Sequence, residues 1–390
     1  MYLNSDGKVS VDIDSALYEY VQSVKLKYAT LRACLEKSGY VVNTADECVF
    51  NKEVDGGQCT LLVGINEVLC LCADEEQHQH LADLLRAEFG DTRYENSDVL
   101  TFLGMELDFS LPEKVIVSMT GYERALLDDY KVAGVATSPA TNSLCDIDEQ
   151  SVLLNEKGKT RFSTFVAQLL YIGSRVRPEI LVATEFLCSR VCRATEQDNK
   201  KLHRVMSYLN SNQCASVELE ASERLKVRVF MNASRGVENN KQRRGVMVTL
   251  GTAPVWASAQ QQNVKCETAA ESDLCCLSDT VKRVAWILEF IERQGLRVGA
   301  STIFLSDGSM LVENGQISLD GNSYQKKRSK RMAFLVNKYV KRKWIKFRTI
   351  PDDVMVANLF VKPLQGKLFR NLRAAVVRQR LTQPRGCEDE

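Results

Sequence analysis

Residues 60–73, Thr-Leu-Leu-Val-Gly-Ile-Asn-Glu-Val-Leu-Cys-Leu-Cys-Ala, decide the fold that the sequence predicts. Two apolar runs rich in strand-forming residues flank a short polar break at Asn66 and Glu67. Apolar runs separated by a few turn-forming residues are typical of a β-hairpin, and the apolar character of each run indicates burial. The stretch therefore predicts a buried hairpin over 59–73 with its turn at Asn66-Glu67.

Helices are predicted on both sides of this hairpin. Residues 14–38 place apolar side chains at helical spacing, and Gly39 then provides a residue that commonly ends a helix. A second helix over 75–89 begins after Asp74, a favourable N-cap, and ends at Gly90. Strands are expected at 8–13, 48–51, 100–107 and 115–119, which gives the order β-α-β-β-α-β.

The middle of the chain has a helical pattern. A helical segment begins at Tyr122, and the polar residues 136–160 are expected to form a loop. Helices then fit 161–175, 178–192 and 196–210. Pro178 suits the first turn of its helix because that position needs no backbone donor.

From about Val217 the pattern changes to strands with helices between the later ones. Strands are expected at 225–231, 245–250, 253–258, 301–305 and 344–350, with a long helix over 269–295 and a basic helix over 327–342. Strands that are first consecutive and then separated by helices indicate a mixed α/β domain.

Taken together, several segments resemble the Pol polyprotein of copia-type retrotransposons. Its reverse transcriptase is similar to residues 16–23 (Ala-Leu-Tyr-Glu-Tyr-Val-Gln-Ser), 45–50 (Ala-Asp-Glu-Cys-Val-Phe), the hairpin, and 102–107 (Phe-Leu-Gly-Met-Glu-Leu). The segment that joins polymerase to nuclease resembles residues 165–172 and 177–180 (Arg-Pro-Glu-Ile), and the elements after Val217 resemble the attached RNase H domain. The resemblance implies an α+β / α/β fold class. It implies a truncated palm-like antiparallel sheet with helices over 1–119, a helical thumb or connection over 120–215, and an RNase H-like mixed α/β domain over 216–390.

For the polymerase part, the resemblance implies RNA-directed DNA polymerisation with Mg²⁺ ions held by three aspartates. One aspartate would come from an early palm strand that we expect to lie upstream of this chain, and two from the hairpin tip. Asn66 and Glu67 stand at the two tip positions, and Glu19 and Lys27 stand where the family has glycine and tryptophan. An amide and a longer carboxylate arm suit the near-octahedral ligation of Mg²⁺ poorly. We therefore expect Mg²⁺ not to bind tightly and DNA synthesis to be absent.

For the nuclease part, the resemblance implies hydrolysis of RNA in RNA–DNA hybrids by two metal ions, held by carboxylates in the order Asp, Glu, Asp, Asp. The equivalent positions here are Asn232, Glu271, Asp307 or its neighbour Ser306, and Asn358. Two carboxylates have become amides, so the charge that concentrates cations at such a site is reduced. We expect hybrid cleavage to be absent.

Two carboxylates, Glu271 and Asp307, remain as possible metal ligands. One alternative is a residual metal-dependent nuclease that uses both of them with substitute ligands. The other is structural, because an acid in the first turn of a helix is favourable and Asp307 suits an ordinary turn.

A basic block near the C-terminus predicts nucleic-acid binding. Residues 321–350 contain eleven Lys and Arg residues and no Asp or Glu. Its clusters are Lys326, Lys327, Arg328, Lys330 and Arg331, followed by Lys341, Arg342 and Lys343. Such a block can neutralise phosphates of RNA, DNA or an RNA–DNA hybrid with a salt-dependent affinity. The alternatives are a solvated helix face and a nuclear-import patch. Tyr339 and Trp344 within the block are expected to pack rather than to stack on bases.

Composition sets the remaining limits. The 390 residues are 45% hydrophobic and 26% charged, as in ordinary globular proteins, and the net charge of +1 means that any nucleic-acid face must be local. The sequence predicts no signal peptide and no membrane span. Thirteen cysteines without a metal-ligand spacing suit a reducing intracellular compartment, cytoplasmic or nuclear.

Overall fold

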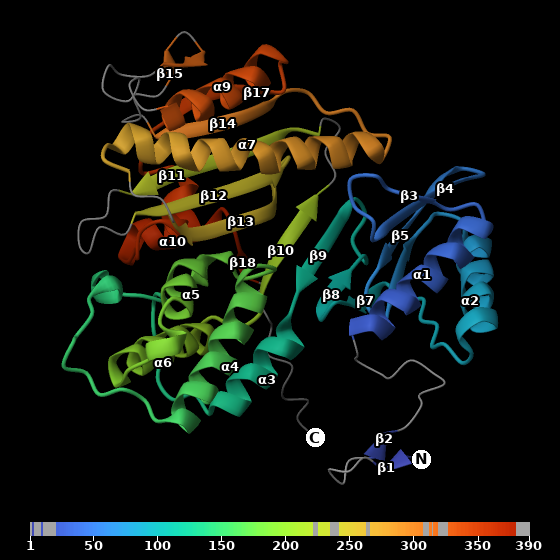
Figure 1. The fold of residues 1–390 in the computed structure, drawn as a ribbon, viewed down its shortest axis with the longest axis horizontal. Helices are drawn as coiled ribbons and strands as arrows, with labels where there is room; N and C mark the ends of the chain where they lie inside the picture. Colours follow the sequence, from blue (N-terminus) through green and yellow to red (C-terminus); the bar gives the residue numbers. More distant parts are fainter. Residues whose placement is uncertain are drawn as a thin grey trace, which may run out of the picture. The chain divides into compact units, whose positions relative to one another are not determined.

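The computed structural model describes residues 2–3, 9–10, 21–220, 225–234, 242–262, 266–306, 312–313, 315–318 and 327–379. Within these ranges the protein is a mixed α+β structure with antiparallel and mixed sheets (Figure 1). It divides into two compact units, Met1–Ser97 with Glu289–Leu296, and Asp98–Leu288 with Arg297–Glu390. No helix in these ranges combines the length and the apolar character needed to cross a membrane.

The first unit contains a four-stranded antiparallel sheet in the order β3-β4-β5-β6. Its strands are β3 (Val41–Val42), β4 (Val49–Val54), β5 (Gly57–Val63) and β6 (Val68–Leu71), and its helices are α1 (Val21–Lys37) and α2 (Glu75–Phe89). The core between the helices and the sheet consists of Leu31, Leu35, Tyr40, Phe50, Cys59, Leu61 and Leu81. Two short strands, β1 (Tyr2–Leu3) and β2 (Val9–Ser10), form a separate pair. The rest of the strand predicted at 8–13 and residues 14–20 of the first predicted helix lie outside the described residues.

The predicted hairpin is confirmed as β5 and β6. Val63 pairs with Val68, and the N–H of Gly64 donates to the carbonyl of Glu67 at 2.8 Å, which closes a loop that contains Asn66. The predicted caps of α2 are also confirmed. The carboxylate of Asp74 accepts from the N–H of Glu76 at 3.0 Å, and Gly90 ends the helix.

The strand predicted at 100–107 is wrong, because the segment folds back on itself. It forms β7 (Val99–Phe102) and β8 (Met105–Asp108), joined at Leu103 and Gly104. Both joining residues have positive φ, 50° and 70°, as a tight two-residue hairpin turn requires. A glycine in the middle of an apolar run was the signal for this turn.

A second sheet joins distant parts of the chain in the order β18-β10-β9-β8-β7. Here β9 (Lys114–Ser118) pairs with β10 (Ala215–Glu220), which in turn pairs with β18 (Arg378–Gln379). Strand pairing therefore links the end of the predicted palm segment to the start and the end of the predicted nuclease segment. The division into domains at 119 and 215 stays a prediction.

The helical region consists of α3 (Thr120–Tyr130), α4 (Glu156–Gly173), α5 (Leu181–Cys188) and α6 (Glu196–Ser211), with short 3₁₀ segments at Asn142–Cys145, Pro178–Ile180 and Val191–Arg193. Residues 136–160 are not a continuous loop, because Asn155 caps α4 by accepting from the N–H of Gly158 at 2.8 Å. The helix predicted over 178–192 is broken. It ends at Cys188, and the buried Arg190 that follows pairs with Asp198 at 3.1 Å.

A buried ion cluster holds this helical region together. The Arg177 side chain is 0% exposed, and its Nη1 donates to the two carboxylate oxygens of Glu123 at 2.6 and 2.8 Å. Its Nε donates to Glu179 at 2.9 Å, and the Tyr208 hydroxyl donates to the same carboxylate at 3.2 Å. Burial alone would lower the pKa of Arg177, but the carboxylates of Glu179 and Glu123 outweigh it and raise that pKa, so the guanidinium stays charged. The Arg-Pro-Glu-Ile motif thus has a packing role.

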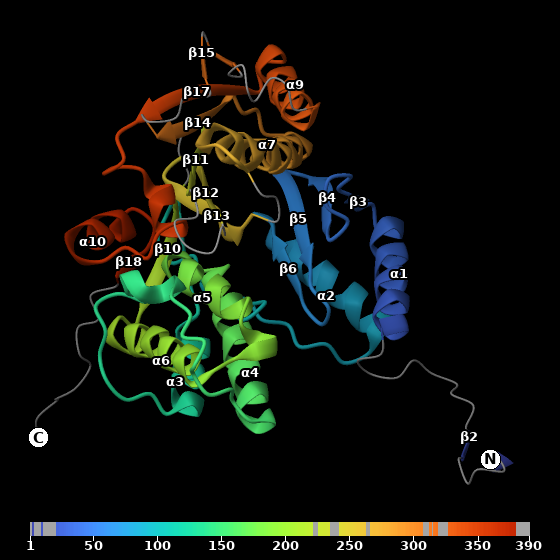
Figure 2. The same ribbon diagram turned by 60° about the vertical axis from the view of Figure 1, so that its left-hand side comes forward.

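The third sheet is mixed, in the order β13-β12-β11-β14-β17. Strands β11 (Val227–Ser234), β12 (Arg243–Leu250) and β13 (Ala253–Gln261) are antiparallel, whereas β14 (Ser301–Ser306) and β17 (Ile345–Ile350) run parallel to β11. Helix α7 (Ala269–Arg293) and helix α10 (Gly366–Ala374) lie on opposite sides of this sheet (Figure 2). Helix α9 (Lys327–Lys341) precedes β17, a 3₁₀ segment η4 (Val356–Phe360) precedes α10, and β15 (Val312–Glu313) pairs with β16 (Gln316–Ile317).

Strand β12 and η4 approach each other closely at Gly245. A Cβ atom there would lie 2.6 Å from Val361 Cγ2, 2.7 Å from the Ala357 carbonyl oxygen and 2.8 Å from Phe360 Cβ. We therefore expect Gly245→Ala to lower the free energy of unfolding by about 1–3 kcal/mol through overpacking. Urea denaturation measures the change. Gly299→Ala is the matched control, because a Cβ at Gly299 meets nothing within 4 Å, and an equal loss in both variants would contradict the prediction.

Candidate functional site

The hairpin tip carries a lysine contact. The ammonium of Lys27, on α1, donates to the side-chain oxygen of Asn66 at 3.0 Å, and Ile65, Asn66 and Glu67 are all exposed. A cation bound at this amide oxygen would stand beside a positive charge, and like charges at such distances repel. Lys27 and Asn66, two positions at which the sequence differs from the family that it resembles, are therefore in direct contact.

Three polar residues meet at one edge of the mixed sheet. Strands β11, β14 and β17 are parallel, so their carboxyl ends lie at the same edge. Phe230 pairs with Phe304, which places Asn232 on β11 level with Ser306 at the end of β14. Asp352 follows the end of β17. Ligands of open α/β sheets commonly bind at such an edge.

Two asparagines at this edge are bonded to each other. Asn232 Nδ2 donates to Asn358 Oδ1 at 2.6 Å. The remaining oxygen of Asn232 accepts from the N–H of Ala233 at 2.8 Å, and Asn358 Nδ2 donates to the Asp352 carbonyl at 2.8 Å. Asn358 is buried in η4, and Asn232 is half-buried. Each amide thus uses both its oxygen and its nitrogen within the protein.

This arrangement depends on the residues being amides. Two aspartates in the same places would bring two negative oxygens together, which is unfavourable without a cation or a shared proton between them. The asparagine pair is stable without either, because one amide donates and the other accepts. The hydrogen bond therefore occupies the position where paired carboxylates would need a metal ion.

Glu271 lies in the first turn of α7, which begins at the same edge of the sheet. Ser234 at the end of β11 pairs with Arg243 on β12, and Arg243 pairs with Gln261 on β13, so the end of β13 lies at this edge. The next residue, Gln262, forms hydrogen bonds of 2.9 and 3.1 Å with Ser272 in α7. The Glu271 residue is 4% exposed.

The contacts of Glu271 serve the start of the helix. Its Oε2 accepts from the N–H of Glu267 at 2.9 Å, and its own N–H donates to the Thr268 hydroxyl at 3.1 Å. These are helix-capping contacts, in which a carboxylate and a hydroxyl satisfy N–H groups that have no partner in the helix. The expectation of an acid in the first turn of this helix is confirmed.

The third carboxylate position is only partly described. Ser306 donates from its hydroxyl to Asp352 Oδ1 at 2.6 Å, and Asp307 lies outside the described residues. Asp352 was missed in the sequence. Its signal was its place two residues after the strand at 344–350, because the end of a parallel strand delivers side chains to this edge.

The donors described at this edge differ from those of a magnesium site. Mg²⁺ prefers carboxylate oxygens and water in near-octahedral geometry. The described part of the edge offers two amides bonded to each other, a hydroxyl, Asp352, and the Glu271 carboxylate, which accepts from the N–H of Glu267. Among the residues that the structure describes, no group of three or more His, Cys, Asp or Glu side chains is arranged to hold a metal ion.

Helix α9 presents a basic face. Ser329, Ala333 and Val336 are buried and attach the helix to the domain. The exposed positions are Lys327, Arg328, Lys330, Arg331, Lys338 and Lys341 on the helix, Arg342 and Lys343 after it, and Lys346 and Arg348 on β17. Lys326 lies outside the described residues. The exposed basic residues of α9 lie on the side of the helix opposite the buried Ser329, Ala333 and Val336, and we call them the α9 basic face.

An exposed aromatic ring lies within this face. Phe334 is 75% exposed, one helical turn from Lys330, Arg331 and Lys338. Tyr339 and Trp344 are half-buried and contact each other, with ring centroids 5.8 Å apart, in agreement with the expected packing. Phe334 was missed because an apolar residue in a helix is ordinarily assigned to the core.

No family model matches the chain, and no curated protein is significantly similar to it. The residues and the geometry of these sites are therefore the guide to their function.

Proposed function

We propose that the chain is a fragment of a copia-type retrotransposon Pol polyprotein whose RNase H-like domain has lost its metal chemistry and retains nucleic-acid binding. The observation that carries the proposal is the 2.6 Å hydrogen bond between Asn232 and Asn358 at the carboxyl edge of the parallel strands. It lies where the resemblance requires two aspartates, and it satisfies both side chains without a cation.

The order of the elements supports the RNase H-like part of the proposal. Three antiparallel strands, a long helix, a parallel strand, a basic helix and a final parallel strand follow one another from β11 to β17. This is the order that the resemblance implies. The antiparallel sheet β3-β4-β5-β6 with its two helices likewise supports a palm origin for the first unit.

The contact between Lys27 and Asn66 supports loss of polymerase chemistry in the same way. A lysine ammonium 3.0 Å from the tip amide provides a positive charge where the family places metal ions. A residual nuclease based on Glu271 is not favoured, because the contacts of its carboxylate secure the start of α7.

The retained activity in this proposal is binding through the α9 basic face. Its cations would contact phosphates and release counterions, which gives an affinity that falls as salt rises. Phe334 adds an exposed ring on which an unpaired base can stack, and stacking of this kind tolerates any sequence.

The test is charge reversal on α9. We expect Lys330→Glu with Arg331→Glu to weaken binding of an RNA–DNA hybrid by roughly tenfold or more at about 0.1 M salt, and to reduce the slope of log K against log salt by up to about 2. Fluorescence anisotropy across about 50–200 mM salt measures both quantities. Lys157→Glu with Lys200→Glu is the control, since both lysines are exposed on other helices and the net charge changes equally. Equal losses in the two double variants, or binding by the parent that ignores salt, would contradict the proposal.

A further inference from the structure

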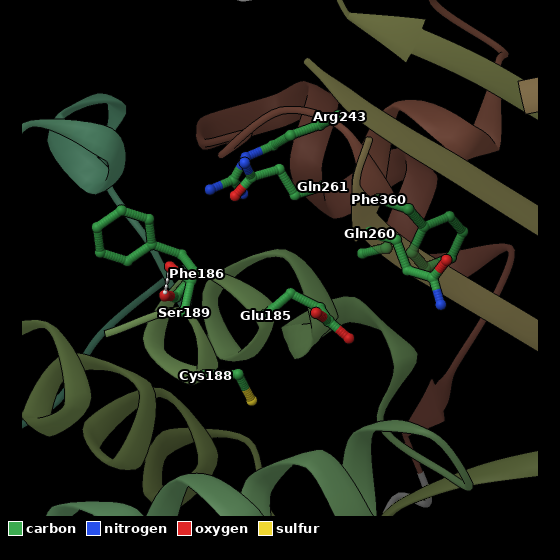
Figure 3. A pocket seen from close by; sticks show the side chains of 9 residues that line it. Glu185, Phe186, Cys188, Ser189, Arg243, Gln260, Gln261 and Phe360 are labelled. Atoms are coloured by element: carbon green, nitrogen blue, oxygen red, sulfur yellow. Dashed lines mark hydrogen bonds between the residues drawn. The ribbon is translucent and has the colours of Figure 1, made fainter. Parts of the chain in front are cut away.

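A pocket of about 300 Å³ lies between α5 and the carboxyl edge of β13 (Figure 3). Its walls include Glu185, Cys188, Arg243, Gln260, Gln261 and Phe360. Phe360 belongs to η4, the segment that also carries Asn358. Pockets of this size accept small ligands, and the edge of the sheet is a common place for them.

Glu185 is the unusual residue of this pocket. It is half-buried, yet among the described residues its carboxylate has no hydrogen-bond or ion-pair partner. Burial raises the pKa of the Glu185 carboxyl, and the Arg243 guanidinium opposes that shift. Elsewhere in this unit, the buried carboxylates of Glu123 and Asp198 are paired with arginine. A half-buried carboxylate that lines a pocket and has no partner among the described residues is available to a ligand that supplies hydrogen-bond donors.

Arg243 provides a positively charged hydrogen-bond donor, whereas Glu185 provides a negatively charged acceptor. Its Nη1 donates to the Val182 carbonyl at 3.3 Å, and its guanidinium lies 5.7 Å from the centre of the Phe186 ring, so two contacts fix its position. Figure 3 shows Arg243 and Gln261 side by side, across the pocket from Glu185 on α5. Arg243 lies near enough to oppose the rise in the pKa of Glu185, but the two side chains do not form an ion pair, so both are available to one ligand.

The remaining walls favour a flat, partly apolar ligand. The Phe360 ring closes one side of the pocket. Burial raises the pKa of the Cys188 thiol to about 11, so this group stays neutral. Gln260 is held in place because its side-chain oxygen accepts from Arg244 Nε at 3.1 Å.

We infer that this pocket binds a guanine base, with Glu185 accepting from its N1–H and N2 amino group and Arg243 donating to its O6 and N7. A carboxylate has two acceptor oxygens and binds best to two adjacent donors. Guanine presents two adjacent donors on its pairing edge, whereas adenine, cytosine and uracil do not. Arginine is the usual partner of the O6 and N7 acceptors of guanine. A free nucleoside and a single strand can both carry this base.

This inference goes beyond the proposed function, because it does not involve the α9 basic face. The pocket is therefore tested with a free nucleoside, for which phosphate contacts are absent. Binding of guanosine without binding of hybrids would support the pocket and contradict the α9 basic face. Binding of hybrids without binding of guanosine would do the reverse.

The experiment is calorimetric titration of the full chain with guanosine, inosine and adenosine. We expect saturable binding of guanosine, weaker binding of inosine, which lacks the N2 amino group, and the weakest binding of adenosine. Glu185→Gln replaces one acceptor by a donor and is expected to reduce guanosine affinity by about 10- to 100-fold. Glu149→Gln, an exposed glutamate in a loop of the same unit, is the control and should bind like the parent.

Competition identifies the source of the base. A short single strand with one central guanine that displaces guanosine assigns a strand-borne base, whereas a failure to displace it assigns a free nucleoside. Absence of saturable guanosine binding by the folded parent overturns the inference. So does equal affinity for adenosine, or an unchanged affinity in a Glu185→Gln variant whose circular dichroism matches the parent.

Discussion

Replacing Arg177 by methionine is expected to lower the free energy of unfolding by about 3–5 kcal/mol, because it removes the counter-charge bonded to the buried Glu123 and leaves Glu179 with only the longer 4.0 Å contact to Arg373. Arg177 is fully buried, and it is bonded to Glu123 from α3 and to Glu179 from the 3₁₀ segment before α5. Methionine fills much of the same space, so the loss reflects charge rather than a cavity. Urea denaturation followed by circular dichroism measures it.

Two further variants separate this charge effect from general disruption. Arg193→Met removes an exposed arginine in the same region and should change the free energy of unfolding by less than about 0.5 kcal/mol. Adding Glu123→Gln and Glu179→Gln to Arg177→Met should recover part of the loss, because the uncompensated charges are then removed as well. A triple variant less stable than Arg177→Met alone would show that the cluster acts through shape.

Placing aspartate at positions 232 and 358 together is expected to make the stability of the protein depend on divalent cations. In the parent the two amides form a 2.6 Å hydrogen bond. Two carboxylates at that separation repel each other, so the double variant should be less stable than the parent in EDTA. Because Mg²⁺ or Mn²⁺ would bind the folded state and not the unfolded one, each cation should then raise the melting temperature of the variant. The parent should show no such rise.

Hybrid cleavage is the second readout of the Asn232→Asp, Asn358→Asp double variant. If this edge is a former metal site, as proposed, the two introduced aspartates together with Glu271 and Asp352 supply carboxylates at the edge of the parallel strands, and cleavage with Mg²⁺ or Mn²⁺ should appear, whereas we expect none from the parent. Asn142→Asp is the control, since Asn142 is exposed and its side-chain oxygen accepts from Gln365 in a contact that an aspartate can keep. A double variant that gains neither cation-dependent stability nor cleavage would contradict the assignment of this edge as a former metal site.

Local sequence signals predicted the local elements well. Asp74 and Gly90 defined α2 to the residue, and the apolar runs around Asn66 defined the β5–β6 hairpin, because caps and turns depend on a few neighbouring side chains. The Leu103–Gly104 turn was missed although its glycine was visible, since a single glycine in an apolar run is also compatible with one continuous strand.

The contacts within the site could not be predicted from the sequence, because they join residues that are far apart in the chain. The resemblance indicated the positions Asn232 and Asn358, but the hydrogen bond between them joins residues 126 positions apart, and it depends on how η4 packs against β11 and β12. Glu185 had no sequence signal, because an isolated glutamate in an apolar helix becomes notable only when its partners are known to be absent. Phe334 is an apolar residue whose exposure was not expected, since only the packing of α9 reveals that its ring faces solvent.

The pairing of β9 with β10 has a consequence for synthesis on the ribosome. Val117 pairs with Val217, so one edge of β9 has no strand to bind until about 100 more residues have emerged. At roughly 5–20 residues per second this interval lasts about 5–20 s. During that time β9 is an open strand edge that other nascent chains can join. A chain whose synthesis stops before β10 has emerged from the ribosome would therefore keep this edge open and be prone to aggregation, whereas a chain in which β10 has emerged can close it.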